Sequence, residues 1–303
     1  MEKSLASSQT MKAGKMRAWI QASRPPFFIA TLIPLFVGWV IARDGGLHPG
    51  RFLLVVLASF MVHLATNLAN DYFDYLEGTD SGESIGGSRV IQEGKLAPRS
   101  LARAITGLYG VACLIAFYLM ISLHLFIILP LVLFAFVSSL FYVAPPIRYG
   151  YHGLGEVFVG INMGPLMVVG TYWVIAGHPA WMPLYVSVPI GLMVASILYY
   201  QSLPDMVTDM EAGKHTLALK LGKRGAYLGL ILFFVLIYGS ITILLLFGVL
   251  SRPALFSLLG IPLLFKLLAL VRSTDNWVML DQYGKYVRMI YFINGCAILA
   301  ALF

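Results

Sequence analysis

The chain has 303 residues, of which 59% are hydrophobic and only 12% are charged. Soluble domains carry about 25% charged residues, so this composition excludes an ordinary soluble globular protein. The net charge of +7 would suit a protein that binds nucleic acid, unless the basic residues have another reason for their positions.

Apolar segments long enough to cross a membrane, about 20 residues each, recur along the chain. They predict an all-α, polytopic bundle of about nine transmembrane helices, at 25–43, 51–76, 101–121, 124–143, 155–177, 181–203, 226–249, 253–271 and 284–303. A tight hairpin at 122–124 is expected to join the third and fourth spans. Residues 25–303 are predicted to form one membrane domain behind a polar tail, residues 1–24, in which no cleavable signal peptide is expected.

The basic residues predict the orientation of the bundle. If the N-terminus lies inside, every Lys and Arg except Arg43, Arg51 and Arg252 falls on one face. Cytoplasmic loops are enriched in Lys and Arg, so this face and the N-terminus are expected to be cytoplasmic. The same rule explains the net charge without a nucleic-acid partner. The long loops, about 77–100, 204–225 and 272–284, lie on this face, which is therefore where we expect the chemistry.

The second span ends in a polar cluster made of Asn67, Asn70, Asp71 and Asp74. Side chains spaced i, i+3, i+4 and i+7 share one face of a helix. An unpaired carboxylate deep in a bilayer costs roughly 2.5–3.5 kcal/mol on insertion scales. The cluster is therefore expected to need a cation.

The sixth span ends in a second acidic pair, Asp205 and Asp209, which lie one helical turn apart on the same predicted face of the membrane. Ligands that are all oxygen favour Mg²⁺, which commonly takes one or two carboxylates together with substrate phosphates. The alternative is that these are helix-end charges that meet water. We predict a magnesium site made of Asn67, Asp71, Asp74, Asp205 and Asp209.

Several polar side chains near the clusters are candidates for a diphosphate group: Arg24, Asn70, Arg89, Lys95, Arg148 and Lys214. Arginine recognises phosphate with two parallel hydrogen bonds, and lysine acts as a point charge. The alternative for each basic residue is an anchor at the inner face of the membrane.

Other candidates would contact the rest of a substrate. Tyr142 and Tyr200 lie beside the polar groups and could offer ring faces to a carbocation, although tyrosine is also common at membrane interfaces. Glu156 and Asn162 lie in the fifth span and are candidate acceptor contacts, while Glu156 could instead be a helix-start carboxylate. Cys113 and Cys296 are expected to be buried thiols.

These residues resemble the UbiA superfamily of intramembrane prenyltransferases. The stretch from Asn70 to Asp74, with Asn67 before it, is similar to the first family motif, and Asp205 with Asp209 is similar to the second. The similarity includes Arg24-Pro25, Arg89-Val90, the stretch from Tyr142 to Arg148, and Gly153-Leu154-Gly155-Glu156. The resemblance covers most of the chain.

The resemblance implies transfer of a prenyl group from an allylic prenyl diphosphate to an acceptor. Two Mg²⁺ ions would bridge the aspartates to the diphosphate, and basic side chains would stabilise its developing charge. The isoprenoid tail would lie in an apolar channel open to the lipid bilayer, and no other cofactor is implied.

Details of the motifs bear on the acceptor. Many family members have a third Asp at the position of Gly78. A Gly at this position resembles the branch of the family that prenylates 1,4-dihydroxy-2-naphthoate in menaquinone synthesis. That branch usually has an Asn pair and an Arg before the second motif, where this chain has Gln201, Ser202 and Pro204. An aromatic acceptor is therefore the first hypothesis, and a glycerol-phosphate lipid acceptor is the second. Outside the family, a membrane transporter remains an alternative, although transporters place such groups near the bilayer midplane.

Overall fold

The computed structural model describes residues 14–78 and 87–303, and this part of the chain is helical, without a strand. The all-α prediction is therefore confirmed for the described residues. Residues 14–23 form the first helix, and residues 1–13 of the predicted tail lie outside the described part. The longer helices that follow are α2 (Phe28–Ile41), α3 (Pro49–Glu77), α4 (Pro98–Ser122), α5 (Leu129–Phe141), α6 (Gly155–Ile161), α7 (Met167–Ala176), α8 (Met182–Gln201), α9 (Met206–Glu211), α10 (Leu217–Leu246), α11 (Ile261–Ser273) and α12 (Gly284–Ala301).

Short helical segments connect them. These are η1 (Pro25–Phe27), η2 (Arg43–Gly45), η3 (Phe126–Ile128), η4 (Tyr149–His152), η5 (Asn162–Leu166), η6 (Arg252–Gly260) and η7 (Trp277–Tyr283). The segment η5 is a π-helical turn that contains Pro165, and it joins α6 and α7 into one continuous rod. Local π geometry of this kind re-satisfies the backbone groups that a proline frees.

Seven helices within the described residues are long and apolar enough to cross a membrane: Gly14–Ile41, Pro49–Glu77, Pro98–Ser122, Gly155–Ala176, Met182–Gln201, Leu217–Leu246 and Arg252–Ser273. The predicted span at 124–143 corresponds to a shorter apolar helix, Phe126–Phe141. The span at 284–303 corresponds to α12, which carries Lys285 and Arg288 near its start. The described chain thus has a helix at every predicted span, and the count of nine crossings stays a prediction.

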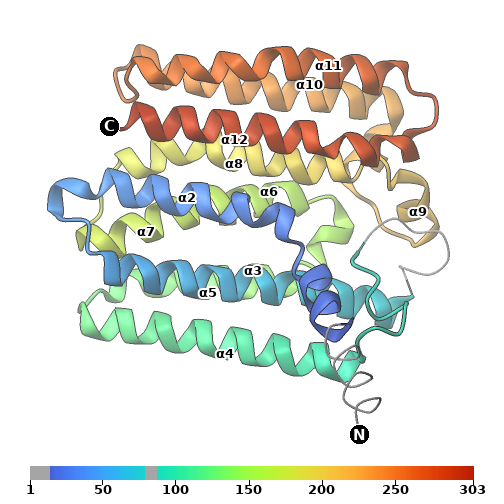
Figure 1. The fold of residues 1–303 in the computed structure, drawn as a ribbon, viewed down its shortest axis with the longest axis horizontal. Coiled ribbons are helices and arrows are strands. Elements are labelled where there is room, and N and C mark those ends of the chain that lie inside the picture. Colours follow the sequence, from blue (N-terminus) through green and yellow to red (C-terminus); the bar gives the residue numbers. More distant parts are fainter. Residues whose placement is uncertain (1–13, 79–86) are drawn as a thin grey trace, which may run out of the picture.

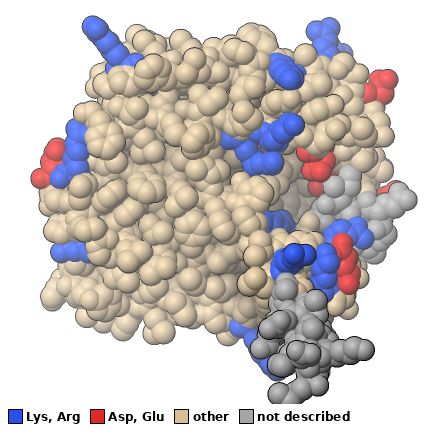
Figure 2. All heavy atoms as spheres, in the orientation of Figure 1, with Lys and Arg blue, Asp and Glu red and all other residues tan. Residues whose placement is uncertain are grey.

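The helices lie side by side with their axes roughly aligned (Figure 1). The pair α10 and α11 forms one edge, α4 forms the opposite edge, and α2 and α8 lie between them (Figure 1). The C-terminal ends of α3 and α8, together with α9, meet at one end of the bundle. In the space-filling view, a broad uncharged surface separates charged side chains at the two ends of the helices (Figure 2). This is the surface that a membrane-spanning bundle presents to lipid.

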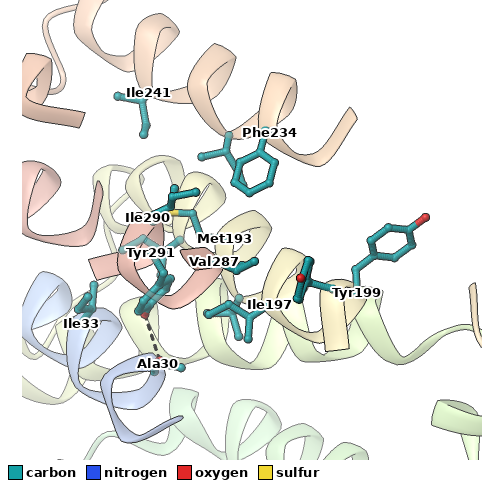
Figure 3. Packing of buried hydrophobic residues seen from close by; sticks show 14 of the residues in the cluster. Ala30, Ile33, Met193, Ile197, Tyr199, Phe234, Ile241, Val287, Ile290 and Tyr291 are labelled. Atoms are coloured by element: carbon teal, nitrogen blue, oxygen red, sulfur yellow. Dashed lines mark hydrogen bonds between the residues drawn. The ribbon is translucent and has the colours of Figure 1, made fainter. Parts of the chain in front are cut away.

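A core of buried side chains joins α2, α8, α10 and α12 (Figure 3). Ile33, Met193, Phe234 and Ile290 belong to this core, and the Tyr291 hydroxyl donates a hydrogen bond to the Ala30 carbonyl oxygen at 3.3 Å. Lipid tails are as apolar as these side chains, so close packing and hydrogen bonds, rather than water exclusion, hold such helices together.

Small residues allow the rod formed by α6, η5 and α7 to approach α8 closely. A Cβ atom added to Gly164 would lie 2.5 Å from the Gly191 Cα atom, and one added to Gly160 would lie 3.2 Å from the Gly191 carbonyl oxygen. Gly160 and Gly164 have the spacing of the GxxxG motif, which brings membrane helices into backbone contact. This contact places the rod, and with it Asn162.

The expectation that both cysteines are buried is wrong: Cys113 on α4 and Cys296 on α12 are free and exposed. In a membrane helix an apolar neighbourhood does not imply burial, because the outer face of the helix is apolar as well.

The variant Gly164→Val is expected to destabilise the fold, because its side chain overlaps the α8 backbone. Overpacked sites cost about 1–3 kcal/mol, which thermal unfolding in detergent would detect as a lower Tm. The matched control is Gly107→Val on α4, where an added Cβ atom meets nothing within 4 Å. An unchanged Tm for Gly164→Val, with the control also unchanged, would contradict this packing.

Candidate active site at the end of the bundle

Asp71 is almost completely buried near the end of α3, with 1% of its surface exposed. Its Oδ1 atom lies 2.5 Å from the Arg24 Nη2 atom and accepts a hydrogen bond of 2.9 Å from the Ser88 backbone N–H. The Ser88 hydroxyl donates to Oδ2. A carboxylate can be buried when charge and hydrogen bonds compensate it, and here the compensation ties α3 to two other segments.

A second layer of hydrogen bonds supports Ser88. The Gln21 Nε2 atom donates to the Ser88 carbonyl oxygen at 2.7 Å, and the Lys95 Nζ atom donates to Gln21 Oε1 at 2.9 Å. Lys95 also pairs with Glu93 at 2.5 Å. Lys95 therefore reaches the site through Gln21 and Ser88, and its predicted contact with a diphosphate stays a prediction.

Lys214 brings the two acidic motifs together. Its Nζ atom lies 3.6 Å from Asp74 Oδ2 on α3 and 3.9 Å from Asp209 Oδ1 on α9. Asp74 is also buried, and it accepts a hydrogen bond from the Tyr151 hydroxyl. The Lys214 ammonium lies 4.9 Å from the centre of the Tyr151 ring, within cation–π range. Asp74 and Asp209, which lie far apart in the sequence, thus share the positive charge of Lys214. The predicted Mg²⁺ between the motifs, with Lys214 on a diphosphate, stays a prediction.

Asp205 lies between α8 and α9, and its Oδ1 atom is buried without a hydrogen-bond partner among the described residues. Burial raises the pKa of Asp205 to about 7, and the nearby Asp209 carboxylate acts in the same direction. A buried, unpartnered carboxylate oxygen is costly, so this atom is suited to a cation.

Arg148 makes a paired ion contact with Glu77, the last residue of α3. Its Nη1 and Nη2 atoms lie 3.0 and 2.5 Å from the two Glu77 oxygens. The fork holds the loop after α5 against the end of α3. Arg148 thus lies at the predicted end of the bundle. Its two parallel hydrogen bonds to a carboxylate have the geometry with which arginine also binds phosphate.

Three predicted diphosphate-binding arginines share an uncommon backbone conformation. Arg24, Arg89 and Arg148 have φ angles of 53°, 60° and 44°. A residue with a Cβ atom pays roughly 1–3 kcal/mol to adopt such sparsely populated conformations, which cluster at functional sites. Each arginine is therefore held in place by its surroundings.

An apolar cavity of about 360 Å³ opens beside this charged end. Arg24, Asn67 and Asn70 line it at one end, and Val55 and Leu119 line it at the other. Val55 and Asn70 on α3 are 15 positions apart, which corresponds to about 22 Å at a rise of 1.5 Å per residue. The cavity is thus long, and its polar end includes Arg24, which pairs with Asp71.

The predicted substrate contacts fall into two groups. Tyr142 and Asn162 line the cavity, where Asn162 Oδ1 accepts a hydrogen bond of 2.8 Å from the Ser138 hydroxyl. Glu156 is buried in the first turn of α6 but is absent from the cavity wall. Tyr200 also lies away from the cavity, because it is packed in the core with its hydroxyl donating to the Leu280 carbonyl oxygen at 2.8 Å. The structure therefore gives Tyr200 a packing position.

Ser88, Gln21 and Tyr151 are parts of the site that the sequence reasoning missed. Ser88 stands directly before Arg89 in a glycine-rich stretch, and Tyr151 lies between Arg148 and Glu156. Their nearness in the sequence to other candidates was the available signal. Ser, Gln and Tyr are too common near such motifs to indicate a site by themselves.

The donor set fits a divalent cation that is shared with a phosphate group. Among residues 14–78 and 87–303, no three Asp, Glu, His or Cys side chains form a metal-binding group by themselves. Asp74 and Asp209 nevertheless share the Lys214 ammonium, and Asp205 offers an unpartnered oxygen. Mg²⁺ usually takes one or two carboxylates and completes its shell with water and substrate phosphates, which this arrangement allows.

Comparisons with known proteins agree with the geometry. The model of the UbiA prenyltransferase family matches residues 31–278. The 1,4-dihydroxy-2-naphthoate octaprenyltransferase of Bacillus subtilis (strain 168) is 28% identical over 68% of this chain and 66% of its own length. UbiA prenyltransferase domain-containing protein 1 of Gallus gallus is 34% identical over 74% of this chain and 67% of its own length. About a third of each relative therefore lies outside the match.

Solved structures share the fold. A digeranylgeranylglyceryl phosphate synthase superposes with a TM-score of 0.63 at 18% identity, covering 95% of this chain and 98% of that one. A UbiA homologue from Archaeoglobus fulgidus, described as bound to DMAPP and Mg²⁺, superposes with a TM-score of 0.57 at 13% identity, covering 92% and 98%. At these identities the likeness concerns the fold alone.

The affinity for Mg²⁺ is expected to fall as the pH is lowered through 7. A proton on Asp205, whose pKa is about 7, competes with the metal, so the carboxylate is available above that pH and blocked below it. Between pH 8 and pH 6 the dissociation constant should rise about tenfold, since each pH unit below the pKa removes a factor of ten of the ionised form. Calorimetric titration with Mg²⁺ measures this, and a constant affinity would contradict it.

Proposed function

This chain belongs to the UbiA prenyltransferase family, and we propose that it transfers a prenyl group from an allylic prenyl diphosphate to an aromatic acceptor. Two observations carry the proposal: Asp74 and Asp209 share the positive charge of Lys214, and a long apolar cavity reaches Arg24, the ion-pair partner of Asp71. A diphosphate with its metal would occupy the charged end, and an isoprenoid tail would fill the apolar part.

We propose that two Mg²⁺ ions would be held by the side chains of Asn67, Asp71, Asp74, Asp205 and Asp209. When bound, Mg²⁺ supplies Lewis-acid stabilisation of the diphosphate leaving group. Asp71 and Asp74 are already oriented for this role, because Ser88 and Tyr151 donate hydrogen bonds to them. Ordered ligands of this kind lower the cost of binding.

The basic side chains would receive the diphosphate oxygens. Arg24 and Lys214 contact the aspartates, and Arg148 contacts Glu77. We propose that the diphosphate also contacts Arg89, Lys95 and Asn70. As the allylic C–O bond breaks, its electron pair leaves with the diphosphate, and the basic groups stabilise the added charge.

The cavity would protect the allylic cation from water. Its wall beyond the charged end is mainly apolar, with Tyr142 near the polar groups. The ring face of a tyrosine attracts cations. The acceptor ring would then supply the electron pair for the new bond and release one proton.

We propose menaquinone synthesis as the pathway, because two relatives are named 1,4-dihydroxy-2-naphthoate octaprenyltransferase. A glycerol-phosphate lipid acceptor is the second candidate, favoured by the fold shared with digeranylgeranylglyceryl phosphate synthase. A transporter is disfavoured because the charged groups lie at one end of the cavity rather than at its middle.

We further propose a multi-pass protein of the cell membrane in which residues 25–303 act as one catalytic domain behind the 1–24 tail. The N-terminus and the active site would face the cytoplasm, where a charged, water-soluble diphosphate head can enter. The distribution of Lys and Arg supports this orientation.

Replacing Asp205 by Asn should lower kcat/KM for prenyl transfer by roughly 100-fold or more, because it removes a charge that holds the metal–diphosphate group. The variant should stay folded in detergent, since Asp205 Oδ1 has no hydrogen bond to lose. Asp44→Asn is the matched control, since the Asp44 carboxylate is 97% exposed beside Arg43. Near-normal turnover by Asp205→Asn would refute the metal assignment.

An acceptor screen separates the two candidate reactions. Purified protein with Mg²⁺ and a radiolabelled prenyl diphosphate should prenylate 1,4-dihydroxy-2-naphthoate and leave a prenylated glycerol phosphate unchanged. Product from the glycerol phosphate alone would overturn the aromatic acceptor while leaving the transferase intact.

A further inference from the structure

A polar stripe extends along α3 from the acidic cluster into the apolar cavity. Ser59, His63 and Thr66 line the cavity, as do Asn67 and Asn70. Their spacing of three and four residues puts all five side chains on one face of the helix. The polar face of α3 therefore continues for more than two turns beyond the motif, into the part of the cavity where an isoprenoid tail alone would need no polar partner.

His63 is the ionisable member of this stripe, and its ring is held in a defined orientation. The Nδ1 atom is hydrogen-bonded to the hydroxyl of Thr31, a completely buried residue on α2. The ring of Phe28 contacts it edge-on with centroids 6.0 Å apart, and the ring of Phe60 lies parallel to it at 6.5 Å. An imidazole fixed on three sides offers its remaining nitrogen in one direction.

The other ring nitrogen, Nε2, makes no hydrogen bond to any residue within 14–78 and 87–303. Ionisable side chains inside a membrane protein are expensive and usually serve function. In either neutral tautomer Nε2 can form one hydrogen bond: it donates when Nδ1 accepts from Thr31, and it accepts when Nδ1 donates. The ligand that completes the pair must therefore carry a hydroxyl or carbonyl oxygen.

The position of His63 indicates which substrate carries that oxygen. His63 lies one turn from Asn67, about 6 Å along the helix axis, on the side away from the aspartates. The diphosphate would remain with the aspartates, and the tail that follows it has no polar atom. The acceptor, whose nucleophilic atom must come within about 3–3.5 Å of the first prenyl carbon, is the substrate that brings an oxygen to this depth.

We propose that His63 binds an oxygen-bearing group of the acceptor, with Thr31 as its positioning residue. The inference rests on the proposed function and deepens it, because it assigns the acceptor subsite. The ligand class is an uncharged hydroxyl or carbonyl on an aromatic ring. A second phosphate is a poor match, since Arg24 is the only Lys or Arg among the described residues that line the cavity, and it contacts Asp71.

Two substitutions separate this role from a purely structural one. In His63→Asn the amide can replace Nδ1 and keep the Thr31 hydrogen bond, but nothing replaces Nε2. In His63→Gln the longer amide can reach the position of Nε2. His178→Asn, at an exposed histidine before α8, is the matched control.

Steady-state kinetics with 1,4-dihydroxy-2-naphthoate and geranyl diphosphate should show that His63→Asn raises the acceptor KM about tenfold, the equivalent of one lost hydrogen bond. The KM for geranyl diphosphate, its Mg²⁺-dependent binding and the Tm should stay unchanged. His63→Gln should recover most of the acceptor affinity, and Thr31→Val should raise the acceptor KM by a smaller factor.

An unchanged acceptor KM in His63→Asn, or an equal rise in both KM values, would overturn the acceptor subsite. These outcomes leave the proposed function standing, because the wild-type protein still transfers the prenyl group. A wild-type protein that binds no prenyl diphosphate in the presence of Mg²⁺ would instead remove the proposed function itself.

Discussion

Buried negative charge at the end of α3 is the constraint on which the rest of the site depends. Asp71 and Asp74 are 1% and 2% exposed, and Glu156 is the only other charged side chain so deeply buried among the described residues. Each aspartate can persist there only if cations and hydrogen bonds compensate it. Arg24 and Ser88 compensate Asp71, while Lys214 and Tyr151 compensate Asp74. The arrangement thereby joins α3 to four other segments of the chain.

The same constraint links the charged end to the cavity. One helix, α3, carries the aspartates at its end and a polar stripe along the cavity wall. Close contact between Gly164 and Gly191 positions the opposite wall, which carries Asn162. A substrate with a charged head and a long apolar tail matches this gradient from charge to hydrocarbon. The charged head of such a substrate would lie beside the charged side chains, and its apolar tail would lie in surroundings that resemble lipid.

Much of this could be predicted from the sequence, because membrane composition leaves few alternatives. Apolar length predicted the helices, and the rarity of carboxylates directed attention to Asp71, Asp74, Asp205 and Asp209. Partners across the chain could not be predicted: Ser88, Gln21 and Tyr151 belong to residue types that are common in loops and at interfaces. Tyr200 shows the converse limit, because its position beside the second motif did not reveal that its hydroxyl bonds to Leu280. His63 could not be predicted either, because a single histidine in an apolar segment gives no sign of the cavity that it lines.

We propose that the two acidic motifs jointly hold a divalent metal with a diphosphate. A structure determined with Mn²⁺ and a non-hydrolysable prenyl thiodiphosphate, with the metal located by its anomalous scattering, tests it most directly. We expect Mn²⁺ between the aspartates of α3 and those around α9, bonded to diphosphate oxygens, with Lys214 moved onto the diphosphate. Diphosphate bound by Arg and Lys alone, with no Mn²⁺ within bonding distance of Asp71, Asp74, Asp205 or Asp209, would contradict it.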